Sequence, residues 1–252
     1  MTGLDEILAD GLQRLELRAL KRRAAERLAR HALDDRVSPE TINRIVRQAG
    51  GNTFYLEELI RHVAEDGKRD LPESVLAMVQ SRLENLDREA RRILRAASIF
   101  GEVFWEGGLR ALLGSSIPAA SISRWLEVMV ANEMLSRVTD DRFPADPAFA
   151  FRHGLIREAA YAMLTESDRE LGHRLAAGWL EQSGEHDPLV LADHFQRGAE
   201  NQRAVRHFIR AAQAAYDGGN YPAILPICDR AVACGAQGEE RGEIMLSIAR
   251  KY

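Results

Sequence analysis

Apolar residues recur at the three- and four-residue spacing of an α-helix along most of the chain. Residues 12–33 carry leucines and alanines on one stripe and arginines mostly elsewhere, which predicts an amphipathic helix. A second helix is predicted to begin at its N-cap Ser38 and to end at Gly50-Gly51, and a third follows at once. Turn-forming residues then close this helical unit, so we predict a first domain over residues 1–70.

The next part of the chain changes from helical to alternating periodicity. Helices are predicted at 74–86, 88–99, 106–113 and 120–135, and glycines and a proline separate them. Residues 135–152 then hold two short apolar runs around a tip rich in Asp and Pro, which predicts a β-hairpin. Helices followed by a hairpin are the layout of a winged helix, and we predict this domain over residues 71–155.

The last part, residues 156–252, is rich in alanine and again periodic. Small and aromatic residues around positions 204–231 roughly follow the pattern of tetratricopeptide (TPR) helix pairs, so either a helical-repeat array or a simple helical bundle is open. Pro226 falls inside one predicted helix, where it costs about 3 kcal/mol unless the helix bends or starts there. Since an array needs about three repeats, we expect this region to be incomplete. Helices are predicted at 154–164, 167–183, 188–199, 202–217, 221–234 and 239–251.

Composition excludes several classes of protein. The 252 residues are 46% hydrophobic and 29% charged, which is typical of a folded globular chain and not of a disordered one. The net charge of −4 is not that of a nucleic-acid-binding tail. The two cysteines, Cys228 and Cys234, lack the spacing of a redox or zinc site, and no long apolar run is present. We therefore expect a mainly α, cytoplasmic protein without membrane partners.

No self-contained active site is visible in the sequence. A phosphate-binding P-loop needs G-x-x-x-x-G-K-[ST], and the one Gly-Lys pair, Gly67-Lys68, is followed by Arg and lacks the earlier glycine. Nucleophile-elbow, zinc-protease and kinase motifs are missing, and the seven histidines have no metal-ligand spacing. We expect the chain alone not to be an enzyme and to hold no metal.

Six segments of the chain share the motifs of a known family. They are AGGNTFYLEELIR (49–61), LPESV (71–75), SRL (81–83), AASIFG (96–101), FRHGLIREAAY (151–161) and LGHRLA (171–176). In this order they resemble the signal-transducing (STAND, AAA-type) P-loop ATPases of large bacterial regulators. The resemblance covers about residues 12–235 and is greatest to multidomain serine/threonine protein kinases that carry such a module.

The resemblance implies a role for the chain. In such proteins a P-loop core precedes a helical lid, a winged helix and helical repeats, and this chain looks like everything after the core. It implies a regulatory fragment that transmits the state of a sensor to a P-loop core, and possibly to a kinase domain, in cis. ATP or ADP would bind only together with that core, and no cofactor is expected for the isolated chain.

Four candidate nucleotide-binding residues follow from the likeness. His153 aligns with a winged-helix histidine that contacts the nucleotide β-phosphate, although Gly154 replaces the family's Asp; a packed histidine is the alternative. Gly51, Asn52 and Thr53 align with a Gly-x-Pro element near the adenine, although Thr53 replaces its Pro. Their alternative is an interhelical turn with Asn52 or Thr53 as N-cap. His173 and His194 match family positions too, and we expect both to be packed.

Two other functions stay open. The chain could be a free-standing helical-repeat module that binds a protein or peptide on a concave surface. A winged helix could also read DNA with its third helix. Residues 121–135 argue against DNA, because they hold one basic residue, Arg124, against two glutamates, whereas binding DNA depends on neutralising its phosphates.

Overall fold

The computed structural model describes residues 19–33, 37–66, 75–238 and 242. Within these residues the protein is mainly α, as the sequence predicts, and a small three-stranded antiparallel sheet stands where the sequence predicts a two-stranded hairpin. The chain divides into two compact units, Met1–Met78 and Val79–Tyr252. The predicted domain boundaries near residues 70 and 155 stay predictions.

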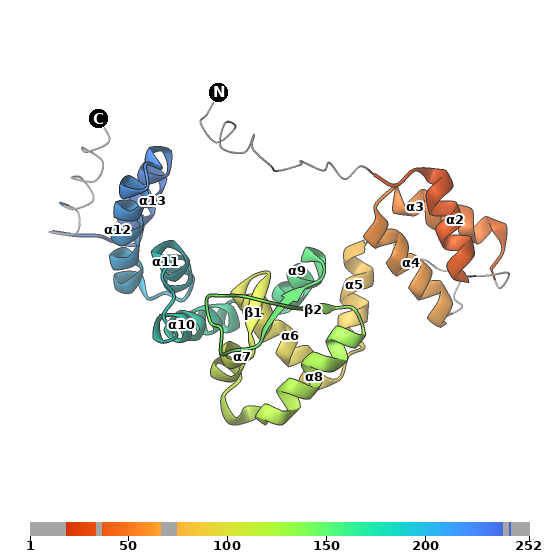
Figure 1. Cartoon of the computed structure of the whole chain (residues 1–252), viewed down its shortest axis with the longest axis horizontal. Coiled ribbons are helices and arrows are strands. Elements are labelled where there is room, and N and C mark those ends of the chain that lie inside the picture. Colours follow the sequence, from red (N-terminus) through yellow and green to blue (C-terminus); the bar gives the residue numbers. More distant parts are fainter. Residues whose placement is uncertain (1–18, 34–36, 67–74, 239–241, 243–252) are drawn as a thin grey trace. The chain divides into compact units, whose positions relative to one another are not determined.

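In the described part of the first unit, three helices pack around a small apolar core (Figure 1). They are α2 (Arg22–Leu33), α3 (Pro39–Ala49) and α4 (Thr53–Asp66). Ser38 caps α3, since its side chain accepts a hydrogen bond from the Thr41 amide. Apolar side chains of all three helices form the core, including Ala29, Ile45 and Leu59.

The predicted continuous helix over 12–33 is wrong in its described part. Residues 19–21 are not helical, and α2 begins only at Arg22. The reason is a long-range bond: the Leu20 amide donates to the Gly51 carbonyl at 2.9 Å, which holds this backbone against the α3–α4 turn. Residues 12–18 lie outside the described residues.

The second unit begins with helices and three short strands. In order they are α5 (Val75–Glu84), which crosses the boundary between the units, α6 (Arg88–Phe100), β1 (Val103–Trp105), α7 (Glu106–Leu113), the 3₁₀ turn η2 (Gly114–Ser116), α8 (Ala119–Ala131), β2 (Leu135–Val138) and β3 (Ala148–Phe151). Helix α8 ends earlier than predicted, and Glu133 takes a positive φ of 58° before β2.

The sheet order is β1-β3-β2, so the predicted hairpin forms and a third strand joins it. Leu135 pairs with Phe151 in the hairpin, and Phe104 of β1 pairs with Phe149. The sequence does not predict β1, because three residues are too few to show a periodicity.

In the described residues after β3, the unit continues with α9 (Gly154–Ala162), α10 (Glu166–Gln182), α11 (Pro188–Arg197), α12 (Asn201–Asp217) and α13 (Tyr221–Ala233). From α10 onward each helix packs on the next one along the chain, as helical repeats do (Figure 1). Pro226 lies inside α13, where it removes one backbone hydrogen bond. The last predicted helix, 239–251, falls outside the described residues, apart from residue 242.

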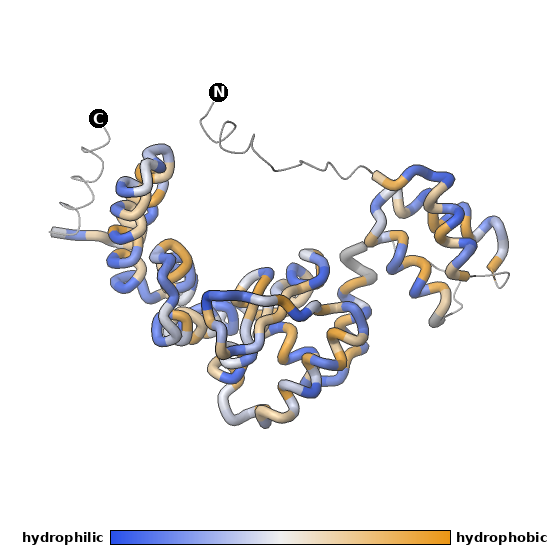
Figure 2. Tube along the Cα trace, viewed as in Figure 1, coloured by the Kyte–Doolittle hydropathy of each residue, from blue (hydrophilic) through white to orange (hydrophobic). Residues whose placement is uncertain are grey.

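Packed aromatic rings join β1 and the β2–β3 loop to α10. Trp105 of β1, Phe143 of the hairpin loop and Trp179 of α10 contact one another, with ring centroids 4.9 to 5.7 Å apart. Phe100 at the end of α6 adds edge contacts to both tryptophans. We call these four residues the aromatic joint. Its Trp105 and Phe143 belong to the same apolar core that continues into α13, and Figure 2 shows apolar residues recurring along each helix.

Candidate functional site

Gly51, Asn52 and Thr53 form the turn between α3 and α4. Gly51 has a φ of +86°, and a Cβ there would lie 3.1 Å from Ala19 Cβ and 3.2 Å from the Leu20 carbonyl oxygen, so the turn requires glycine. The Asn52 side chain accepts a hydrogen bond from the Tyr55 amide at 3.0 Å, which makes Asn52 the N-cap of α4. Asn52 and Thr53 are exposed. The conformation of all three therefore has a structural explanation.

His153 lies at the exit of β3, as the N-cap residue of α9. Its backbone is extended (φ −138°, ψ 133°), its carbonyl accepts from the Ile156 amide at 3.0 Å, and the residue is half-buried. It belongs to the second unit, whereas Gly51, Asn52 and Thr53 belong to the first. Nucleotide binding by these four residues stays a prediction.

A cavity of about 220 Å³ lies between α6, α9, α10 and α11 in the second unit. Its polar wall holds Arg157 and Tyr161 of α9, His173 of α10, and His194 and Arg197 of α11. The close approach of α10 and α11 depends on Gly198, where a Cβ would lie 2.7 Å from the Arg174 backbone nitrogen. The fold thus brings together polar groups of α9, α10 and α11 that are far apart in the sequence.

Three of these side chains form a hydrogen-bonded row. The Tyr161 hydroxyl lies 3.0 Å from His173 Nε2, and His173 Nδ1 lies 3.1 Å from His194 Nδ1. Each contact needs one donor and one acceptor, so the two neutral rings take matched tautomers. If Tyr161 donates, His173 carries its proton on Nδ1 and His194 carries its proton on Nε2.

Burial keeps both imidazoles neutral. His173 is 2% exposed, and burial, followed by repulsion from His194, Arg197 and Arg169, lowers its pKa from 6.5 to about 3. His194 is 8% exposed, and burial and Arg197 lower its pKa to about 4, while Asp193 opposes the shift. Both residues are therefore uncharged at neutral pH.

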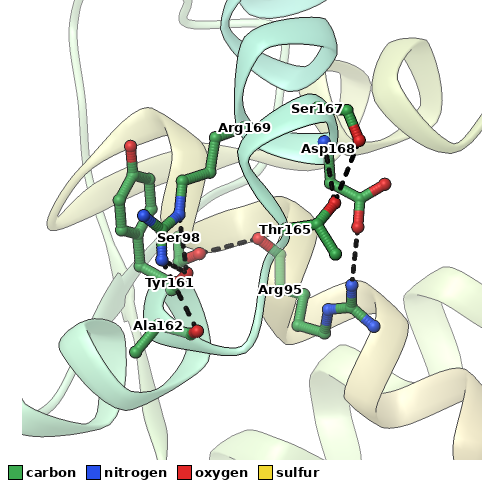
Figure 3. A network of polar contacts seen from close by, with 8 residues as sticks. All are labelled: Arg95, Ser98, Tyr161, Ala162, Thr165, Ser167, Asp168 and Arg169. Atoms are coloured by element: carbon green, nitrogen blue, oxygen red, sulfur yellow. Dashed lines mark hydrogen bonds and ion pairs between the residues drawn. The ribbon is translucent and has the colours of Figure 1, made fainter.

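A network of polar contacts surrounds the backbone of Tyr161 (Figure 3). The Arg169 guanidinium donates to the Tyr161 carbonyl at 3.2 Å and lies 4.7 Å from the centre of the Tyr161 ring. Next to Arg169 in sequence, Asp168 pairs with Arg95 of α6 at 3.1 Å, and Thr165 caps α10. The first turn of α10 is thus tied to α6 through Asp168 and to the backbone of Tyr161 through Arg169.

Other kinds of site are not found among the described residues. No cluster of three or more His, Cys, Asp or Glu side chains in this part of the chain could hold a metal ion. None of the helices described there is both long enough and apolar enough to cross a membrane.

Two comparisons with known proteins bear on the chain. No protein-family model matches it. Over 196 residues it is 27% identical to an uncharacterized protein of Rhizobium meliloti (strain 1021), and the match covers 69% of this chain. The same match covers only 18% of that relative, so the chain corresponds to a small part of a much longer protein.

Proposed function

We propose that the chain is a regulatory part of a nucleotide-switched signal-transduction ATPase, which carries the state of a sensor to a P-loop core that this sequence does not contain. A serine/threonine protein kinase is the parent that the sequence resemblance favours. The observation that carries the proposal is the succession of a helical unit, winged-helix elements and sequentially packed helices, in the order of the resembling motifs. The much greater length of the Rhizobium meliloti relative is also in keeping with a multidomain parent.

His153 is the residue through which the nucleotide would act. It lies between β3 and α9, where a bound phosphate would pull on the connection between the winged-helix elements and the helices after them. A histidine donates well to phosphate oxygens, most strongly when protonated. His153 would then favour the ADP-bound, closed state, and a sensor signal would release it.

The first test is to read the gene upstream of the Met1 codon and downstream of the Tyr252 codon. We expect the frame to run into a G-x-x-x-x-G-K-[ST] core upstream and further helical repeats downstream. Stop codons on both sides would refute the ATPase proposal.

The second test uses the protein that includes the core. His153→Ala should release ADP faster and raise resting activity, whereas His186→Ala, at an exposed position of the same unit, should change neither. Equal ADP retention in the wild type and in His153→Ala would remove His153 from the mechanism. For the 252-residue chain alone, we expect no ATP or ADP binding by calorimetry and no hydrolysis.

A helical-repeat interaction module is the second candidate. The observation that favours it is a row of exposed apolar side chains on α13, formed by Tyr221, Leu225 and Val232. Their spacing of four and seven places them on one face of the helix. A chain bounded by stop codons that binds no nucleotide but binds a peptide through this face would support this candidate.

DNA binding remains the least favoured function. Helix α8 would be the reading helix, yet its Arg124 stacks on Trp125 and its Glu127 pairs with Arg137 of β2. We expect no gel shift with duplex DNA at low salt, and a shift that disappears in Arg124→Ala would reverse this view.

A further inference from the structure

The cavity between α6, α9, α10 and α11 has more positive than negative charge available to a ligand. Arg157 is half-buried and Arg197 is exposed at its rim. Neither guanidinium has a hydrogen-bond or ion-pair partner among the described residues. The one carboxylate in the wall, Asp193, is already paired with Arg230.

His194 adds a third polar group to this wall. Its Nδ1 faces His173, and its Nε2 has no hydrogen-bond partner in the described part of the chain. His194 is one of the residues that line the cavity. When Tyr161 donates to His173, the row of hydrogen bonds leaves the His194 proton on Nε2, so this N–H is the donor that the ring can offer to a ligand.

We propose that this cavity binds a phosphate group, held by Arg157 and Arg197 with His194 Nε2–H as a third donor. Two guanidinium groups match a phosphate that carries between one and two negative charges at neutral pH. The volume of about 220 Å³ equals the liquid share of roughly seven waters, which accommodates phosphate or a small phosphorylated molecule. The proposal does not rest on the nucleotide switch, because none of its residues is a predicted nucleotide contact.

The test is calorimetric titration of the 252-residue chain with inorganic phosphate at neutral pH, with sodium chloride keeping the ionic strength constant. We expect saturable binding at a single site with a millimolar or lower dissociation constant. Arg157→Gln and Arg197→Gln should each raise that constant at least about tenfold. Arg174→Gln is the matched control, because it removes the same charge from an exposed position of α10 that does not line the cavity. It should change the constant by no more than about twofold.

A second measurement reports on His194 directly. In ¹⁵N spectra of the imidazole nitrogens, phosphate should increase the Nε2–H tautomer of His194, and sodium chloride should not. Absence of saturable phosphate binding, or equal weakening by Arg174→Gln and Arg197→Gln, would overturn the proposal. Glycerol phosphate then identifies the source: tighter binding than inorganic phosphate points to a small phosphorylated molecule, and equal binding to free phosphate. Both results support the site.

Discussion

Acid should destabilise the Val79–Tyr252 unit through the buried pair His173 and His194. The perturbation is a change from about pH 7.5 to about pH 4.5, which is below the pKa of an unfolded histidine. The folded unit keeps both rings neutral, because burial and nearby positive charge oppose protonation. The unfolded chain therefore binds more protons than the folded one in this range, and stability falls as the pH falls.

The size of the effect follows from the pKa values. Each ring has a pKa of 6.5 when unfolded, and of about 3 (His173) or about 4 (His194) when folded. At pH 4.5 each contributes about 2 to 3 kcal/mol of destabilisation, and the pair about 5 kcal/mol. The loss begins near pH 6.5 and levels off below pH 4 to 3. It is comparable to the entire stability of many domains, which is about 5 to 15 kcal/mol.

The assay is urea unfolding at a series of pH values, followed by tryptophan fluorescence. All three tryptophans, Trp105, Trp125 and Trp179, belong to the second unit, so the signal reports on that unit alone. The wild type should lose stability steeply between pH 6.5 and 4.5. A His173→Gln, His194→Gln double variant should lose about 5 kcal/mol less over the same interval, whatever its stability at pH 7.5.

The control is His186→Gln, which replaces an exposed histidine of the same unit and should keep the wild-type pH dependence. Parallel curves for the wild type and the double variant would refute the reasoning, since they would mean that neither buried ring resists protonation in the folded state.

Two further predictions concern packing and helix capping. Gly198→Ala places a Cβ 2.7 Å from the Arg174 backbone and should lower the free energy of unfolding by about 1 to 3 kcal/mol. Gly178→Ala, in open space within α10, should raise the free energy of unfolding by about 0.5 to 1 kcal/mol. Fluorescence-detected urea unfolding distinguishes the two signs. Asn52→Ala removes the α4 cap and should cost the first unit about 0.5 to 2 kcal/mol by circular dichroism, whereas exposed Thr53→Ala should change it by less than about 0.5 kcal/mol.

The helices were predictable because their signals are local. Asp87 and Asp187 mark the starts of α6 and α11, where each side chain accepts a hydrogen bond from a backbone amide two residues later. The hairpin was predictable for the same reason, since its strands and turn residues are consecutive. Strand β1 was not, because Val103–Trp105 becomes a strand only by pairing with residues 148–150, more than 40 positions away. The start of α2 at Arg22 was missed because it depends on the distant bond to Gly51.

The cavity could not be predicted from sequence, because its polar groups meet only through packing. His173 and His194 are 21 positions apart on separate helices, with no spacing that marks a pair. Each could be expected to be packed, but their contact with each other depends on how closely α10 approaches α11. Gly198, which permits that approach, looks in sequence like an ordinary helix end. The turn at Asn52 was different, because its capping role was already one of the alternatives that the sequence offered.

The aromatic joint has a mechanical consequence. A hinge between β1 and α10 would have to pull Trp105 and Phe143 away from Trp179 and bring their rings into water, and each ring pair contributes about 0.5 to 1.5 kcal/mol beyond its buried area. The aromatic joint therefore holds β1 and α10 rigidly together. A displacement of α10 would carry the sheet with it, so any bending within this unit must occur at residues outside the four rings.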